Sequence, residues 1–306
     1  MFFKRNKNVN KKDLKGAVMG AIMGDALGVP YEFKNKEEIG SIKLNKVDKW
    51  SDDTSMILCT MESLCELEDY STKHIADKYI QWLYQGYWTP QGIVLDCGRT
   101  TAQALRLYRQ KGILTGINEE DACGNGSLMR IIPLLFYVHK NKENRFNIIK
   151  EFSSITHSNM RCIIGCAIYI ELGLNLLDGM DRETAYLKMQ KTIIKEYEDY
   201  DEELNLFNRI LFNNIYEYSS DTLNGSGYVV HSLESSLHSF MTSKNYKDSI
   251  IKAISIGEDT DTVACITGGL SGLYYGYDDI PKKYIDKLPR RDDILKLLNE
   301  FEEKFR

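Results

Sequence analysis

The stretch GAVMGAIMGDALG at residues 16–28 decides the fold, because it places a glycine at every fourth position. Residues four apart lie on one face of an α-helix, so these glycines form a stripe without side chains. The first stripe comprises Gly16, Gly20, Gly24 and Gly28, and a second, near the other end of the chain, comprises Gly268, Gly272 and Gly276. A glycine inside a helix costs about 1 kcal/mol relative to alanine, which close helix packing offsets. The stripes therefore predict tightly packed helices in the centre of the domain.

The rest of the chain carries helical periodicity and few helix breakers. Only 5 of the 306 residues are proline, and none lies between Pro133 and Pro281. Apolar residues recur at helical spacing after Thr72, and residues 162–177 are apolar nearly all round, as in a central buried helix. Two further stripes consist of Leu204, Phe207, Leu211 and Ile215, and of Val230, Leu233, Leu237, Phe240 and Met241. We expect a compact all-α single domain over residues 13–306, with about a dozen helices.

Charge and cysteine content exclude several classes of protein. Lys and Arg number 39 against 44 Asp and Glu, a net charge of −5, and no long basic run follows the amino terminus, so we do not expect nucleic acid as a partner. The 7 cysteines contain no C-x-x-C pair, which fits a reducing cytoplasm better than a disulfide framework or a zinc knuckle. The basic start imitates a signal peptide, but Asp25 ends the apolar run early. We expect a basic tail at residues 1–12 and a cytoplasmic monomer with no membrane partner.

Two acidic clusters each run directly into an apolar helical segment. They are WSDDT at residues 50–54 and GEDTDT at residues 257–262. Helix capping accounts for any single Asp, but a cap needs one side chain and each cluster offers two carboxylates with flanking hydroxyls. Such oxygen donors select Mg²⁺, Mn²⁺ or Ca²⁺, and paired clusters allow two ions. The residues alone thus indicate a helical, metal-dependent enzyme of unknown substrate.

The segment GNGSLMR at residues 124–130 precedes another apolar run. A glycine-containing loop that opens a helix exposes backbone N–H groups, which suit a phosphate. The segment matches neither the dinucleotide fingerprint nor the P-loop, and Ser127 does not stand in G-x-S-x-G. It therefore adds a candidate phosphate-binding loop and no nucleophile.

Taken together and in order, six motifs resemble the ADP-ribosylglycohydrolase family. They are GDALGVPYE at 24–32, SDDT at 51–54, GNGSLMR at 124–130, THS at 156–158, GSGYVVHSLESSL at 225–237 and GEDTDT at 257–262. The resemblance implies a compact all-α domain with a dinuclear site of two Mg²⁺ or Mn²⁺ ions in a central cleft. It also implies hydrolysis of an ADP-ribosylated protein, with release of ADP-ribose.

The resemblance also implies roles for individual residues. The implied metal ligands are Ser51, Asp52, Asp53, Asp259, Asp261 and Thr262. The implied catalytic residues are Glu32, Asp52 and Asp261, with Glu32 assisting a proton transfer and Asp25 supporting the ligands. The implied substrate-binding residues are Asp96, Gly98, Gly124, Asn125, Gly126, Ser127, His157 and Tyr228. Asp96 either pairs with the guanidinium of ADP-ribosylated arginine or serves as a helix N-cap. Tyr228 either lines the pocket or is a core residue.

Four departures from the family pattern bear on the substrate. Ser51 stands where threonine is usual, and Glu258 replaces a common glycine. Asp121 precedes the glycine loop where small or hydroxyl residues are frequent, and His231 occupies a position that is often acidic. No metal-binding carboxylate is lost, so we expect an active enzyme, with ADP-ribosyl-arginine as its substrate. The alternatives are a serine linkage, O-acetyl-ADP-ribose, a nucleotide phosphohydrolase and a non-catalytic ADP-ribose-binding protein.

Overall fold

The structure, a computed structural model, describes residues 13–306, and the expected basic tail at residues 1–12 lies outside them. Within the described residues the regular structure is helical, with three isolated β-bridges and no strand, so the all-α prediction is confirmed. The α-helices are α1 (Leu14–Gly28), α2 (Lys36–Ile39), α3 (Asp52–Glu66), α4 (Thr72–Gln85), α5 (Arg99–Lys111), α6 (Leu134–Lys140), α7 (Arg145–Ser153), α8 (Met160–Leu177), α9 (Arg182–Glu196), α10 (Asp201–Leu206), α11 (Asn208–Leu211), α12 (Val229–Thr242), α13 (Tyr246–Ile254), α14 (Thr260–Tyr275), α15 (Lys282–Ile285) and α16 (Arg291–Phe305).

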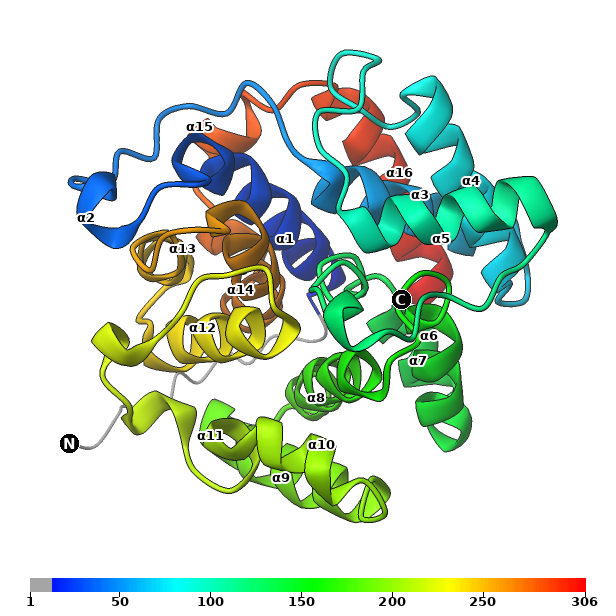
Figure 1. Cartoon of the computed structure of the whole chain (residues 1–306). Helices are drawn as coiled ribbons and strands as arrows, with labels where there is room; N and C mark the ends of the chain where they lie inside the picture. Colours follow the sequence, from blue (N-terminus) through cyan, green and yellow to red (C-terminus); the bar gives the residue numbers. More distant parts are fainter. Residues whose placement is uncertain (1–12) are drawn as a thin grey trace.

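Helices α1 and α14 pack against each other at the centre of the molecule (Figure 1). They run antiparallel, and the glycine stripe of each faces the backbone of the other. A Cβ atom added at Gly20 would lie 2.3 Å from the carbonyl oxygen of Gly268, and one at Gly24 would lie 2.0 Å from that of Ala264. No real Cβ atom fits at such distances, so the predicted close packing is confirmed. Gly276 has another role, because it ends α14 with a φ of 91°.

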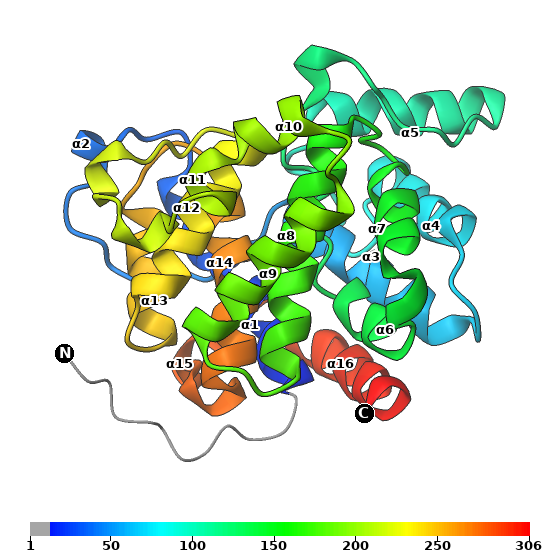
Figure 2. The ribbon, with the colours of Figure 1, turned by 90° about the horizontal axis from the view of Figure 1, so that it is seen from below.

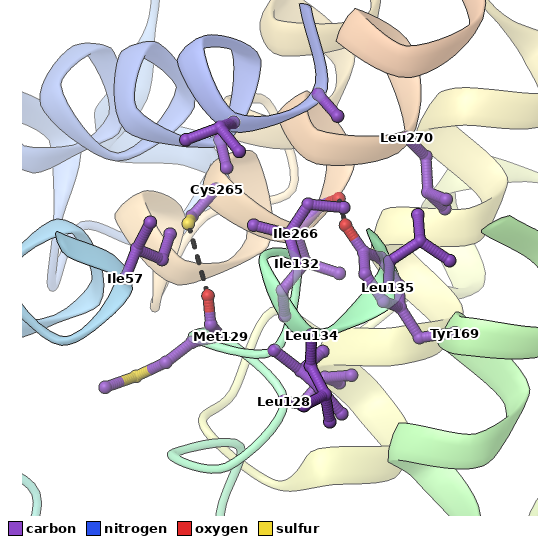
Figure 3. Packing of buried hydrophobic residues seen from close by; sticks show 14 of the residues in the cluster. Ile57, Leu128, Met129, Ile132, Leu134, Leu135, Tyr169, Cys265, Ile266 and Leu270 are labelled. Carbon is purple, nitrogen blue, oxygen red and sulfur yellow. Dashed lines mark hydrogen bonds between the residues drawn. The ribbon is translucent and has the colours of Figure 1, made fainter. Parts of the chain in front are cut away.

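Helix α8 forms the second central element, as expected for residues 162–177. Figure 2 shows it crossing the middle of the ribbon beside α9. It is the one described helix long and apolar enough to cross a membrane, but 94% of it is buried inside the protein, which is typical of a core helix. Its Tyr169 hydroxyl donates to the carbonyl oxygen of Ile266 on α14 at 3.1 Å, within the apolar packing of Figure 3.

Two local expectations are wrong. The stripe from Leu204 to Ile215 is not one helix, because α10 ends at Leu206 and α11 begins at Asn208. The fully buried Phe207 ring between them reaches Gly165 of α8, so tertiary packing overrides the helical period there. The glycine loop does not open a helix directly either. It continues in turns as far as Pro133, after which α6 begins at Leu134.

Candidate active site

A cavity of about 520 Å³ lies where the N-terminal ends of α3, α5 and α14 meet. Residues that are far apart in the sequence converge there. Of the predicted site residues, those that line the cavity are Glu32, Asp52, Asp96, Gly98, Gly124, Asn125, Gly126, His157, Asp259, Asp261 and Thr262. Both acidic clusters and the glycine loop therefore belong to one site.

The start of α3 is capped by residues other than its own acids. Ser51 is the N-cap, and its hydroxyl accepts from the N–H of Asp53. Asp25, fully buried on α1, accepts from the Ser51 hydroxyl at 3.0 Å and from the N–H of Thr54 at 3.0 Å. The capping alternative therefore fails for Asp52 and Asp53, and both carboxylates are available for another function.

The start of α14 is linked to the start of α3 and to the glycine loop. The Thr262 hydroxyl donates to Oδ2 of Asp53 at 3.3 Å, which joins the two clusters. Asp259 is the N-cap of α14, but its side chain makes no capping hydrogen bond. Its Oδ2 instead accepts from the Asn125 amide at 2.7 Å. Ser51 and Asp53 do not line the cavity. They are buried on either side of Asp52 in the sequence, and the Ser51 hydroxyl donates to Oδ2 of Asp53 at 3.0 Å.

Two of the acidic side chains each have a carboxyl oxygen without a hydrogen-bond partner. Oδ1 of Asp53 and Oδ1 of Asp261 are buried without a hydrogen-bond partner. Burial, followed by the neighbouring carboxylates, raises the pKa of Asp53 and of Asp261 well above the usual value and that of Asp52 to about 8. Buried acceptors that repel one another are costly unless a cation lies among them.

The donor set fits a hard divalent cation. Ser51, Thr262 and the four aspartates of the two clusters offer oxygen atoms only, the ligands that Mg²⁺ and Mn²⁺ prefer. Within residues 13–306, no group of three or more His, Cys, Asp or Glu side chains is arranged so that it could hold a metal ion by itself. The orphaned carboxylate oxygens are the observation that supports metal binding at this position.

The glycine loop is shaped by close approach to a buried histidine. A Cβ atom at Gly126 would lie 2.7 Å from Cε1 of His157, so only glycine fits there. Burial, followed by the charge of Arg130, lowers the pKa of His157 to about 3, so the ring is neutral. Its Nδ1 lies 2.8 Å from the Thr156 hydroxyl, which fixes the orientation of the ring.

Two of the residues predicted to bind the substrate, Ser127 and Tyr228, are not among the residues that line the cavity. The Ser127 hydroxyl is buried against Cys166 Sγ at 3.5 Å, because the turn after Gly126 directs it toward α8. The Tyr228 ring packs against His231 at 5.0 Å between ring centroids, and Arg161 lies over it at 5.8 Å. Ser127 is therefore part of the buried interior, whereas Tyr228 is half-buried and lies outside the lining of the cavity.

Asp96 and Glu32 lie at the edge of the cavity. Asp96 is exposed and accepts from the N–H of Cys97, while the N-cap of α5 is Gly98, so the N-cap alternative for Asp96 is wrong. Glu32 follows the 3₁₀ turn Val29–Tyr31 and is partly buried. Burial, followed by the charge of Asp96, raises the pKa of Glu32 to about 7.

Several lining residues are given no role in the site by the sequence. They are Phe33, Arg99, Thr100, Thr101, Met129, Ser226, Gly227 and Glu258. Gly227 lay within a quoted motif, and Glu258 was noted only as a departure from glycine. Its φ of 63° explains why glycine suits that position. Nothing in the sequence marked Arg99.

Comparisons with known proteins agree on one family. The profile of the ADP-ribosylglycohydrolase family matches residues 7–306. An ADP-ribosylarginine hydrolase, Tri1, of Serratia proteamaculans is 30% identical, over 94% of this chain and 78% of that protein. The ADP-ribosyl-[dinitrogen reductase] glycohydrolase of Rhodospirillum rubrum is 25% identical, over 89% of each. A solved ADP-ribosylglycohydrolase-related protein complex has the same fold, with a TM-score of 0.78 at 24% identity, covering 96% of this chain and 98% of that one.

Proposed function

The chain belongs to the ADP-ribosylglycohydrolase family, and on that basis we propose that it hydrolyses the bond between ADP-ribose and arginine on a modified protein. The names of two relatives, an ADP-ribosylarginine hydrolase and a dinitrogen reductase glycohydrolase, support this substrate class. The observation that carries the proposal is the pair of orphaned oxygens, Asp53 Oδ1 and Asp261 Oδ1. They come from different helices. Asp261 lines a cavity of ligand-binding size, and Asp53 is joined to that lining through the Thr262 hydroxyl.

We assign two Mg²⁺ or Mn²⁺ ions to the acidic residues and hydroxyls at the starts of α3 and α14. The ligands in this proposal are Ser51, Asp52, Asp53, Asp259, Asp261 and Thr262. When bound, such ions hold the hydroxyls of the ribose and act as Lewis acids beside its anomeric carbon. Asp25 keeps the Ser51 hydroxyl and the first turn of α3 in place through three hydrogen bonds.

The remaining roles fall to side chains around the ribose and the leaving group. Glu32, whose raised pKa lets it exchange a proton near neutral pH, assists the proton transfer between water and the leaving arginine. Asp96, exposed at the cavity edge, pairs with the guanidinium of that arginine. The glycine loop and the neutral His157 shape the wall that receives the ADP-ribosyl group.

The proposed location and assembly rest on less specific features. We place the protein in the cytoplasm, because all seven cysteines are free thiols. We propose that it acts as a monomer.

Product analysis tests the proposal. An arginine-ADP-ribosylated protein is incubated with the enzyme and Mg²⁺ or Mn²⁺, then with EDTA, then with the metal restored. We expect intact ADP-ribose to be released only when the metal is present. Release of AMP and ribose phosphate would indicate a phosphohydrolase instead. Release of ADP-ribose only from modified serine or from O-acetyl-ADP-ribose would show that the enzyme cleaves that linkage and not the arginine linkage. A protein that binds ADP-ribose without releasing it under any condition would be a non-catalytic binder.

A further inference from the structure

The cavity is strongly acidic, whereas the proposed substrate carries an anionic diphosphate. Six carboxylates line it, those of Glu32, Asp52, Asp96, Glu258, Asp259 and Asp261. Among the lining residues within 13–306, Arg99 is the only lysine or arginine. Metal ions at the two acidic clusters offset the charge at the ribose end. Besides the backbone N–H groups of the glycine loop, a cationic side chain would stabilise the diphosphate, because the surrounding carboxylates repel an anion.

Arg99 links the start of α5 to the segment that precedes the glycine loop. It is the first residue of α5, and its side chain is 73% exposed. Its Nη2 donates to Oδ2 of Asp121 at 2.8 Å and to the Asp121 carbonyl oxygen at 3.2 Å. Asp121 belongs to the 3₁₀ turn Glu120–Ala122, which leads into the loop at Gly124. The guanidinium is therefore held by the Asp121 carboxylate, just before the glycine loop that lines the cavity.

The ion pair between Arg99 and Asp121 is weak and can be exchanged. Asp121 is 69% exposed, and ion pairs on the surface contribute little to stability. A guanidinium binds phosphate oxygens in a bidentate manner, and such charge-assisted pairs are among the stronger hydrogen bonds. The N-cap of α5, Gly98, provides no capping side chain, so the positive end of this helix also favours an anion beside Arg99.

We infer that Arg99 binds the diphosphate of ADP-ribose, and that Asp121 occupies this guanidinium until the substrate displaces it. This inference rests on the proposed function and adds to it a residue that determines affinity. Asp121 acts as an internal competitor, since its carboxylate offers Arg99 the same kind of acceptor as the ligand. Substrates with a diphosphate gain from the exchange, and uncharged nucleosides do not.

Calorimetric titration of the full chain with ADP-ribose, ADP and adenosine, in saturating Mg²⁺, tests the inference. We expect Arg99→Gln to weaken ADP-ribose and ADP binding about tenfold and to leave adenosine binding unchanged. Arg106→Gln is the matched control, because Arg106 is exposed on α5 and does not line the cavity. We expect Asp121→Asn to tighten ADP-ribose binding about threefold, and to have no such effect when Arg99 is already Gln.

The possible outcomes separate this inference from the proposed function. If the unaltered protein neither binds ADP-ribose nor releases it from modified arginine, both are overturned. If the unaltered protein binds and releases ADP-ribose but Arg99→Gln binds it equally well, only the role of Arg99 is overturned. An equal loss of ADP-ribose affinity in Arg106→Gln would show that the effect comes from overall charge, and it would also overturn the role of Arg99. Tightening by Asp121→Asn in both backgrounds would refute the exchange.

Discussion

The two acidic clusters of the cavity are held in place by different kinds of contact. At the start of α3, side-chain hydrogen bonds hold the cluster, with Asp25 accepting from Ser51 and Thr54. At the start of α14, the backbone is held by close packing. A Cβ atom at Gly28 would lie 2.5 Å from Cα of Asp261, and the Thr260 hydroxyl donates to the Gly28 carbonyl at 3.0 Å. Both supports come from α1, so one helix positions both halves of the site by separate contacts that substitutions can test one at a time.

The largest effect is expected from Asp261→Asn in the α14 cluster. Turnover should fall by about a thousandfold or more, because a metal-binding carboxylate is lost. Folding should survive, because Oδ1 of Asp261 has no partner to lose and its charge is opposed by neighbouring carboxylates. The measurements are kcat and Tm, each with and without Mn²⁺. Asp69→Asn, on an exposed residue, is the control. Normal turnover of Asp261→Asn at saturating metal would refute the metal assignment.

The next largest effect, on the free energy of unfolding, is expected from Gly24→Ala, which disturbs the close packing of α1 on α14. Its Cβ would lie 2.0 Å from the Ala264 carbonyl oxygen, so the helices must separate, at a cost of about 3 kcal/mol in unfolding free energy. Gly173→Ala is the matched control, since it is also buried within a helix. Its new Cβ meets only the movable Leu135 side chain at 2.9 Å, and the change should cost less than about 1 kcal/mol. Urea denaturation measures both. Equal losses would show that close backbone approach is not what holds α14.

The smallest effect is expected from Asp25→Asn, which weakens the side-chain hydrogen bonds that hold the start of α3. An amide offers one acceptor oxygen where the carboxylate offers two, so about 1–3 kcal/mol of unfolding free energy is lost. Mn²⁺ affinity, measured by titration, should fall as well, because Ser51 loses its fixed position. Asp13→Asn is the control, because Asp13 also accepts backbone N–H groups, at the other end of α1. It should lower stability without changing Mn²⁺ affinity. A fall of the same size in both variants would mean that Asp25 acts only on the fold.

The central helices could be predicted from the sequence because their signals are periodic. Glycine at every fourth position indicates close packing, and the unbroken apolar segment that became α8 indicates burial on all sides. Periodicity does not identify the partner, however, and only the structure shows that the stripe of α1 packs on that of α14. The break at Phe207 had no local signal either, since burial of that ring is decided by tertiary contact with α8.

The site could be predicted to the level of segments and less well to single side chains. Both acidic clusters and the glycine loop do meet at one cavity. Ser127 and Tyr228 follow glycines in irregular backbone, where no helical or strand period tells which way a side chain points. The first contacts α8 and the second contacts His231. Arg99 belongs to no motif. It is notable because it is the one lysine or arginine among the described residues that line the cavity, and the sequence does not show which residues line it.

The pairing of α1 with α14 also governs the order in which the chain can fold during synthesis. The Thr260 hydroxyl and the Gly28 carbonyl that it contacts are 232 residues apart. At a ribosomal rate of roughly 5–20 residues per second, α1 waits for tens of seconds before its partner emerges. Throughout that interval the glycine face of α1, which packs on α14 in the folded protein, has no native partner. A nascent or prematurely terminated chain that lacks α14 therefore exposes this face of α1 to chaperones or to aggregation. The catalytic centre assembles only near the end of translation.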